Sequence, residues 1–297
     1  MSKVTAILGS KYPIIQGAMG VICNPELVAA VSEAGGFGLL ATAFSMEPDP
    51  FRNNVRATKQ LTNKPFGANL FVMNPHVTEF AQILAEEGVR AVTVSAGSPK
   101  NIIPLLHELD IKAIVVVPAV DVARKARDAG ADAIIAEGSE SGGMQGFRGA
   151  STMVLVPAIV DAISLPVIAA GGICDSRGYR AAMALGAQGI QVGTRFIASR
   201  ECAAHPHYKQ YITDSGETGT GLVNLGRARV HALRTPLVEK ILEDGKIPDG
   251  VFTPTSVEES WIKGRLEAGL LPAGQVAGLI SDIPTVQEII EEMVRGA

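Results

Sequence analysis

The glycine-rich stretch at residues 139–149, SESGGMQGFRG, follows an apolar run and carries few side chains that could exchange a proton. Glu140 is a candidate general acid or base, although a carboxylate here could equally anchor the loop. Met144, at the centre, has a thioether that neither donates nor accepts a proton at neutral pH. Because glycines let a backbone approach a flat ligand closely, the stretch is expected to be a long binding loop without regular structure.

Two further glycine motifs, AAGGICDSRG and QVGTRF, follow apolar runs near residues 170 and 192. The Gly171 and Gly172 amides can approach an anion, and Asp175 can cap the next helix, whose N-terminus favours negative charge. Gly193 and Thr194 offer further amides and a hydroxyl. Either motif alone could be a simple turn, but together they predict a phosphate site.

The stretch QGAMG adds a flat surface, since Gly17, Ala18 and Gly20 leave room for a planar ring. Asn69 ends another apolar run and supplies an amide donor and acceptor, unless it is a core amide satisfied within the protein. A phosphate anchor, a flat floor and a ring-directed amide together suggest a phosphorylated planar cofactor, with flavin mononucleotide (FMN) the natural candidate.

These motifs must be positioned by a repeated unit of a short apolar run, a loop and an amphipathic helix. Runs such as IVVV and VIAA are apolar at consecutive positions, as expected of parallel strands covered on both faces. In the helical segment before Gly88, Val77, Phe80, Ala81 and Leu84 share one face. The predicted strands are 13–19, 37–43, 66–72, 91–97, 112–118, 131–138, 166–172 and 189–196.

Eight such units predict a (β/α)₈ TIM barrel, whose βα-loops form the working face. A doubly wound open sheet is the alternative, but the count is eight and no early GxGxxG motif is present. Residues 1–199 and 270–297 are assigned to the barrel. Residues 200–269 do not follow the repeated unit of strand, loop and helix. They are expected to be an inserted α-helical arm or lid between strand 8 and the last helix. Trp261, taken as exposed, suggests an association surface and a homodimer.

Composition excludes several classes of protein. The 297-residue chain is 47% apolar and 19% charged, with a net charge of −4 and no cluster of basic residues, which argues against nucleic acid as a partner. No apolar run is long enough to span a membrane, and the N-terminus lacks a signal peptide. Three scattered cysteines are too few for a disulfide framework or a zinc site, so no metal is expected. A soluble cytoplasmic protein is the interpretation.

The motifs PIIQGAM, AGGFG, PFGANLF, AEG-x-E-x-GG, PVIAAGGI and QVGTRF occur in order, followed by AHP and AGQ-x-AG. In this order they resemble the nitronate monooxygenase (2-nitropropane dioxygenase) family, which includes the FMN-dependent enoyl-acyl-carrier-protein reductase II, FabK. The resemblance covers essentially the whole chain and implies a TIM-barrel flavoprotein with non-covalently bound FMN. It implies a cofactor site formed by Gly17, Ala18, Met19, Asn69, Glu137, Gly142, Gly143, Gly171, Gly172, Gln191, Gly193, Thr194 and Gln275.

The resembling proteins carry out two reactions. One branch uses NADH or NADPH to reduce FMN and then an enoyl thioester, which an acyl carrier can present; the other oxidises nitronates with O₂. Both usually carry a histidine in the loop after strand 6, where this sequence has Met144. A reductase of an activated C=C bond is the leading hypothesis. A nitronate monooxygenase and a flavin-binding protein with little turnover remain as alternatives. Other groups that could exchange a proton are Tyr12, Glu137, Glu140, Arg148, His205, His207 and His231.

Overall fold

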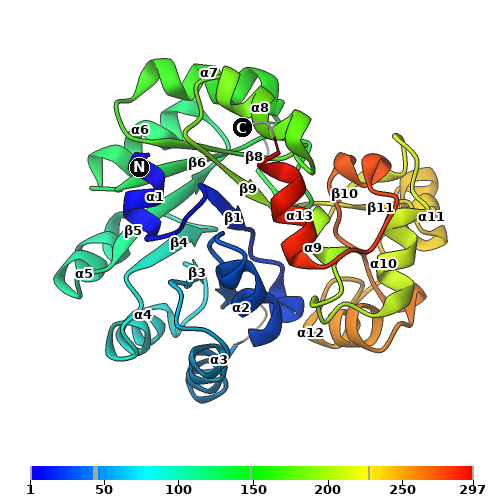
Figure 1. The fold of residues 1–297 in the computed structure, drawn as a ribbon. Coiled ribbons are helices and arrows are strands. Elements are labelled where there is room, and N and C mark those ends of the chain that lie inside the picture. The colour runs from blue at the N-terminus through cyan, green and yellow to red at the C-terminus, as the bar shows by residue number, and fades with distance from the viewer. Residues whose placement is uncertain (1, 43–45, 147–148, 227, 296–297) are drawn as a thin grey trace.

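Eight parallel strands form the centre of the molecule in a computed structural model, which describes residues 2–42, 46–146, 149–226 and 228–295 (Figure 1). Their order around the sheet is β1-β9-β8-β6-β5-β4-β3-β2. Every predicted strand is present, and the (β/α)₈ barrel is confirmed. The strands are β1 (Ile14–Gln16), β2 (Leu39–Ala41), β3 (Gly67–Phe71), β4 (Ala91–Ser95), β5 (Lys112–Val117), β6 (Ala133–Glu137), β8 (Val167–Ala170) and β9 (Gly189–Val192).

The barrel closes at a seam between β1 and β2 that differs from the other strand pairs. A parallel bridge joins Ile15 to Phe37, just before β2 begins. One residue further along, the side chain of Gln16 takes the place of a backbone partner: its Oε1 accepts a hydrogen bond from the Leu39 amide at 3.0 Å. Gln16 is fully buried, and its Nε2 donates to the Gly17 carbonyl and to Cys23 Sγ.

A ring of helices surrounds the strands. In α4, Phe80, Ala81 and Leu84 are buried as predicted, and Gly88 follows with a φ of 80°. The last helix, α13, packs against α2 and α8 and completes the ring, also as expected (Figure 1). The ring helices are α2 (Pro25–Glu33), α3 (Pro48–Leu61), α4 (Val77–Glu86), α5 (Ile102–Glu108), α6 (Val120–Asp128), α7 (Thr152–Ala162), α8 (Ser176–Ala184) and α13 (Val286–Met293).

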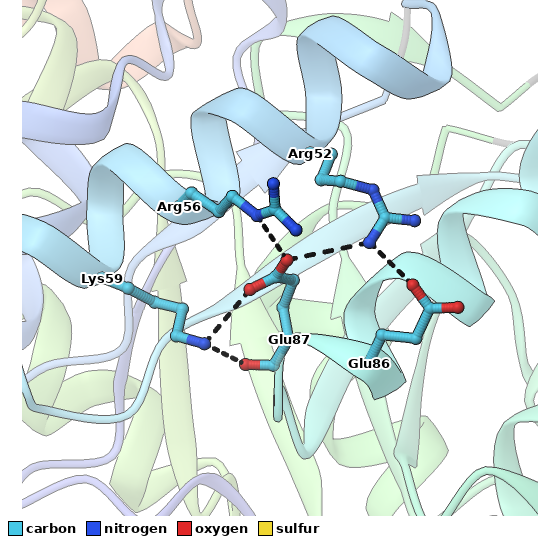
Figure 2. Close-up of polar contacts among 5 residues, drawn as sticks. All are labelled: Arg52, Arg56, Lys59, Glu86 and Glu87. Carbon is cyan, nitrogen blue, oxygen red and sulfur yellow. Dashed lines mark hydrogen bonds and ion pairs between the residues drawn. The ribbon is translucent and has the colours of Figure 1, made fainter.

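A charged cluster links α3 to the end of α4 on the outside of the ring (Figure 2). The Glu87 carboxylate accepts hydrogen bonds from Arg56 Nε at 2.7 Å and Lys59 Nζ at 3.2 Å. Arg52 bonds Glu86 at 2.7 Å and lies 3.7 Å from Glu87. Partial burial opposes ionisation of Glu87, but the bonds from Arg56 and Lys59 outweigh it and hold the pKa of this carboxyl below its usual value.

The interior of the barrel is apolar except at its carboxyl end. Along β6, Ala133 and Ile135 belong to the cluster inside the barrel, whereas Ile134 and Ala136 belong to the cluster between strands and helices. The short helix α1 (Lys3–Leu8) contributes Val4 and Leu8 to the inner cluster and plugs the amino end. Because side chains alternate along a strand, the next inward residue of β6 is Glu137.

The segment between β9 and α13 lies at one side of the barrel (Figure 1). Helices are present there as expected, but the sequence analysis did not foresee the strands β10 and β11. These two strands pair antiparallel, and β11 also pairs with β7 (Gly143–Gln145), which lies in the glycine-rich stretch. The elements are α9 (Thr194–Ile197), α10 (Pro206–Thr213), β10 (Thr220–Asn224), β11 (Arg229–Leu233), α11 (Pro236–Asp244), α12 (Pro254–Val257) and the π-helical turn η3 (Glu258–Ile262).

Short 3₁₀ helices complete the secondary structure of the described residues: η1 (Gly20–Ile22), η2 (Pro99–Asn101), η4 (Leu266–Ala268) and η5 (Gln275–Leu279). Across the described ranges, none of the helices combines the length and the apolar character needed to cross a membrane.

Candidate active site

A cavity of about 520 Å³ opens at the carboxyl ends of the barrel strands. Its walls come from the loops after the strands, from the glycine-rich stretch and from the segment between β9 and α13. In (β/α)₈ barrels this is the face on which ligands bind. The predicted motifs therefore meet at one cavity.

A layer of polar side chains forms the cavity floor above the apolar plug. Strand alternation turns Asn69, Ser95, Glu137 and Gln191 toward the barrel interior, and all four line the cavity. Asn69 is held in place because its Nδ2 donates to Thr93 Oγ1 at 2.9 Å and its Oδ1 accepts from Ser95 Oγ at 3.0 Å. One amide hydrogen of Asn69 remains for a ligand.

The predicted phosphate cradle lies along the same cavity. Gly171 and Gly172 have φ values of 99° and 73°, and a Cβ on Gly171 would lie 3.0 Å from the Gly138 carbonyl. Among the described residues, no acceptor bonds the amides of Gly172 and Gly193. Asp175 caps α8 as expected. A pair of free amides on a cavity wall suits an anion.

Other predicted cofactor residues also line the cavity. Gly17, Ala18 and Met19 follow β1, and Thr194 begins α9 with its hydroxyl accepting from the Gly274 amide at 3.0 Å. The exception is Gln275, whose exposed side chain is not part of the cavity wall. Its backbone amide instead donates to the Glu140 carbonyl at 2.9 Å.

The glycine-rich stretch is more ordered than the sequence suggested, because β7 pairs Met144 with Val230 of β11. Gly142 and Gly143 line the cavity beside Met144, whose side chain is 39% exposed. Gly142 packs closely on the segment before η5, since a Cβ there would lie 2.6 Å from the Ala273 carbonyl carbon. The stretch is thus fixed between the barrel and the inserted segment.

Glu140 anchors this stretch. One carboxylate oxygen accepts hydrogen bonds from the Thr152 amide at 2.7 Å and the Thr152 hydroxyl at 2.8 Å. Thr152 begins α7, so Glu140 ties the glycine-rich stretch to that helix. With both hydrogen bonds made to the start of a helix, this carboxylate serves to anchor the stretch.

Glu137 is in a different environment at the end of β6. Burial raises the pKa of its carboxyl to about 7, against a smaller lowering by a hydrogen bond from the Ser141 side chain. Ser141 is itself fixed, because Gln145 Nε2 donates to its Oγ at 2.6 Å and to its carbonyl at 2.9 Å.

The histidines considered from sequence do not lie on the cavity wall as the structure describes it. His205 caps α10, with its Nδ1 accepting from the His207 amide at 3.1 Å. His231, on β11, is buried behind the glycine-rich stretch. Its Nδ1 donates to the Ser141 carbonyl at 3.1 Å and its Nε2 lies 3.0 Å from the Thr220 hydroxyl. Burial lowers the pKa of His231.

Two further proton-exchange candidates are also absent from the described wall. Tyr12 precedes β1 at the amino end of the barrel, opposite the cavity. Arg148 lies outside the described residues.

Aromatic residues of the inserted segment form a wall that sequence reasoning missed. Tyr208, Phe252 and Trp261 line the cavity together with Pro272 and Val276. The expectation that Trp261 is exposed was wrong: it is 3% exposed, and its Nε1 donates to the Leu270 carbonyl at 2.8 Å. The available signal was a set of large apolar residues in an otherwise polar stretch.

The residues present fit a phosphorylated planar group. Free glycine amides suit a phosphate, the Asn69 amide suits a polar ring edge, and the low surface of Gly17 and Ala18 suits a ring face. Along the described cavity wall there is no Lys, Arg or His, so backbone amides would hold the phosphate. Fold and site together define a cofactor-binding (β/α)₈ barrel enzyme.

Comparison with known proteins narrows this class. The nitronate monooxygenase family model matches residues 1–296. The solved structure of FabK from Thermotoga maritima is 40% identical, with a TM-score of 0.92 over 99% of this chain and 95% of that chain. A probable nitronate monooxygenase of Staphylococcus saprophyticus is 33% identical over 100% of this chain and 97% of its own length.

A third relative, from Rhodococcus jostii, is named (3aS,4S,5R,7aS)-5-hydroxy-7a-methyl-1-oxo-octahydro-1H-indene-4-carboxyl-CoA dehydrogenase. It is 30% identical over 100% of this chain and 95% of its own length. The chain belongs to the nitronate monooxygenase family, whose members are flavin-dependent oxidoreductases.

Proposed function

We propose that this enzyme uses NADH or NADPH to reduce an activated C=C bond, most simply that of an enoyl thioester, with FMN as the bound cofactor. The observation that carries the proposal is the composition of the cavity. Free glycine amides and an apolar set formed by Tyr208, Phe252 and Trp261 line the same cavity. Such a cavity suits a phosphorylated cofactor beside an apolar acyl chain.

Most of the predicted cofactor residues along the cavity have a role in this proposal. The amides of Gly172 and Gly193 hold the phosphate, with Gly171 and Thr194 shaping the cradle. The stretch Gly17–Met19 supports the ring, and Asn69 and Gln191 bond its polar groups. FMN, when bound, supplies the hydride chemistry between the nicotinamide and the substrate.

The names of two relatives support a thioester substrate. One is a carboxyl-CoA dehydrogenase, and the other is FabK, which belongs to the enoyl-reductase branch. Residues 200–269 would act as the lid over this substrate, because they supply the aromatic wall. This segment would also serve as an association surface between copies of the chain.

Nitronate oxidation with O₂ is the second candidate. Met144 favours it in one respect, because a substrate that arrives already as the nitronate anion needs no base to remove a carbon-bound proton. The Staphylococcus saprophyticus relative carries that activity in its name.

Anaerobic mixing of the yellow holoprotein tests the two proposals. Loss of flavin absorbance with NADH or NADPH, followed by reoxidation with crotonyl-CoA, is the expected result. Failure of both nicotinamides to bleach the flavin would overturn the reductase proposal. Bleaching by an alkyl nitronate, with oxygen uptake in air, would establish the second candidate in its place.

A further inference from the structure

We propose that Glu137 is the proton donor of this enzyme, held in position by Ser141, in place of the histidine whose position Met144 occupies. The proposal rests on the reductase function proposed above and assigns the source of the proton that the α-carbon receives in that reaction.

The titratable side chains along the described cavity wall are Glu137, Glu140 and Tyr208. Glu140 is unsuited because one of its oxygens accepts two hydrogen bonds from Thr152, which commits this side chain to anchoring the glycine-rich stretch. Tyr208 donates to the Pro272 carbonyl at 2.5 Å, and burial raises the pKa of its hydroxyl well above the ordinary value. Glu137 remains.

The geometry around Glu137 suits a proton donor. It is the last inward-facing residue of β6, directly above the apolar plug, and it lines the cavity. The side chain that contacts it, Ser141, is fixed from two directions. Gln145 donates to Ser141 Oγ, and His231 donates to the Ser141 carbonyl.

This arrangement also directs the Ser141 hydroxyl hydrogen. Because Gln145 Nε2 is a donor, the Ser141 oxygen accepts from it, and the hydroxyl hydrogen is left to bond Glu137. Ser141 is therefore a positioning residue that sets both the direction and the acidity of Glu137. Burial without a facing cation keeps a large protonated fraction near neutral pH.

In the proposed step, a hydride derived from NADH or NADPH would add to the β-carbon of the enoyl thioester, and the π-electron pair of the C=C bond would move to the α-carbon. The α-carbon takes the carboxyl proton of Glu137, and the resulting carboxylate is reprotonated from solvent. One NAD(P)H and one proton are consumed for each saturated thioester formed.

The test compares Glu137→Gln with the wild-type holoenzyme and with Glu86→Gln, a control on an exposed carboxylate of α4. Crotonyl-CoA turnover by the Glu137 variant is expected to fall about 100-fold or more, while reduction of its flavin by NADH stays near the wild-type rate. Glu86→Gln should match wild type in both. An equal loss in flavin reduction would overturn the proposal, since Glu137 would then serve the cofactor. Unchanged turnover would also overturn it.

Two further readouts separate this proposal from the proposed function. Wild-type turnover should decline above about pH 7, and Ser141→Ala should move that decline to higher pH, because the Ser141 hydrogen bond lowers the pKa of Glu137. A carboxylic-acid infrared band that titrates in the same range in the wild type should be absent in Glu137→Gln, whatever the substrate. Absence of that band in the wild type would overturn the Glu137 assignment alone. A wild type that reduces no thioester but shows the band would overturn the reductase function.

Discussion

Met144 lies on the cavity wall but is fixed by its strand, because β7 pairs it with Val230. Met144 lines the same cavity as Glu137. A thioether suits contact with an apolar substrate chain instead. At the scale of the residue, the proposal above transfers proton donation from position 144 to Glu137.

This transfer predicts a rescue. Met144→His should recover at least about tenfold of the thioester turnover lost in Glu137→Gln, since an imidazole with a pKa near 6.5 can donate a proton there. In the wild-type background the same change should alter turnover by about twofold or less, because Glu137 already donates. Steady-state rates of the four proteins check this. A double variant no faster than Glu137→Gln would show that position 144 does not reach the reacting atoms.

Single residues also show how far sequence reasoning reaches. Asn69 and the glycines of the cradle were predicted from local features of the sequence. Position along a strand predicts where a side chain lies, and a glycine predicts the conformation of the backbone. Tyr208 and Trp261 were missed because their approach to the cavity depends on the path of residues 200–269, which no local pattern encodes. His205 was a candidate by residue type alone, and the structure uses it as a helix cap.

At the scale of elements, the eight barrel strands were predictable because both their faces are buried, which leaves uninterrupted apolar runs. The strands β7, β10 and β11 were not. Their pairing joins residues 143–145 to residues 229–231, and a strand of only three residues gives no periodic signal. Only the fold of the chain between them brings these segments together.

Gly142 provides a test of the packing between the glycine-rich stretch and the segment before η5. Gly142→Ala should displace the glycine-rich stretch, because the new Cβ would lie 2.6 Å from backbone atoms of Ala273 and Gly274. The free energy of unfolding is expected to fall by about 1–3 kcal/mol, with lower flavin content. Gly216→Ala is the control, because no atom lies within 4 Å of the Cβ that it would add. Equal flavin content and thermal stability in the two variants would contradict the tight packing.

The link between α3 and α4 predicts a pH effect on stability. Because the pKa of Glu87 is lowered in the folded state, its contribution is present above its ordinary value of 4.5 and is lost as pH falls below it. Glu87→Gln should cost about 1–2 kcal/mol at neutral pH and less in acid. Glu86→Gln, whose side chain is 60% exposed, should cost about 0.5 kcal/mol or less. Urea unfolding at several pH values measures both, and a Glu87 effect independent of pH would be the contrary result.

At the scale of the whole molecule, the barrel and residues 200–269 share a cavity wall and a three-stranded sheet. They are therefore expected to unfold together. The chain has one tryptophan, Trp261, so its fluorescence reports on the inserted segment, while far-ultraviolet circular dichroism is dominated by the barrel.

The two unfolding curves should coincide and should shift together when FMN is added. Recording both signals on one sample, with and without the cofactor, checks this. A fluorescence midpoint at lower denaturant concentration would show that the inserted segment opens on its own, as an independent lid would.

At the seam between β1 and β2, the hydrogen bonding between neighbouring strands depends on the side chain of Gln16. An amide held by a glutamine oxygen can be released by one rotamer change, without breaking a strand pair. Deuterium uptake at the Leu39 amide should therefore be faster than at the amide of Ala68, which lies on β3 in the continuous part of the sheet. Gln16→Leu should raise deuterium uptake at the Leu39 amide further. Along the seam, the increase in uptake should be largest at the edge of the cavity wall that carries Gly17. Transient opening of this seam would widen the carboxyl end of the barrel, so that a large flat ligand could enter and leave while the other strand pairs stay intact.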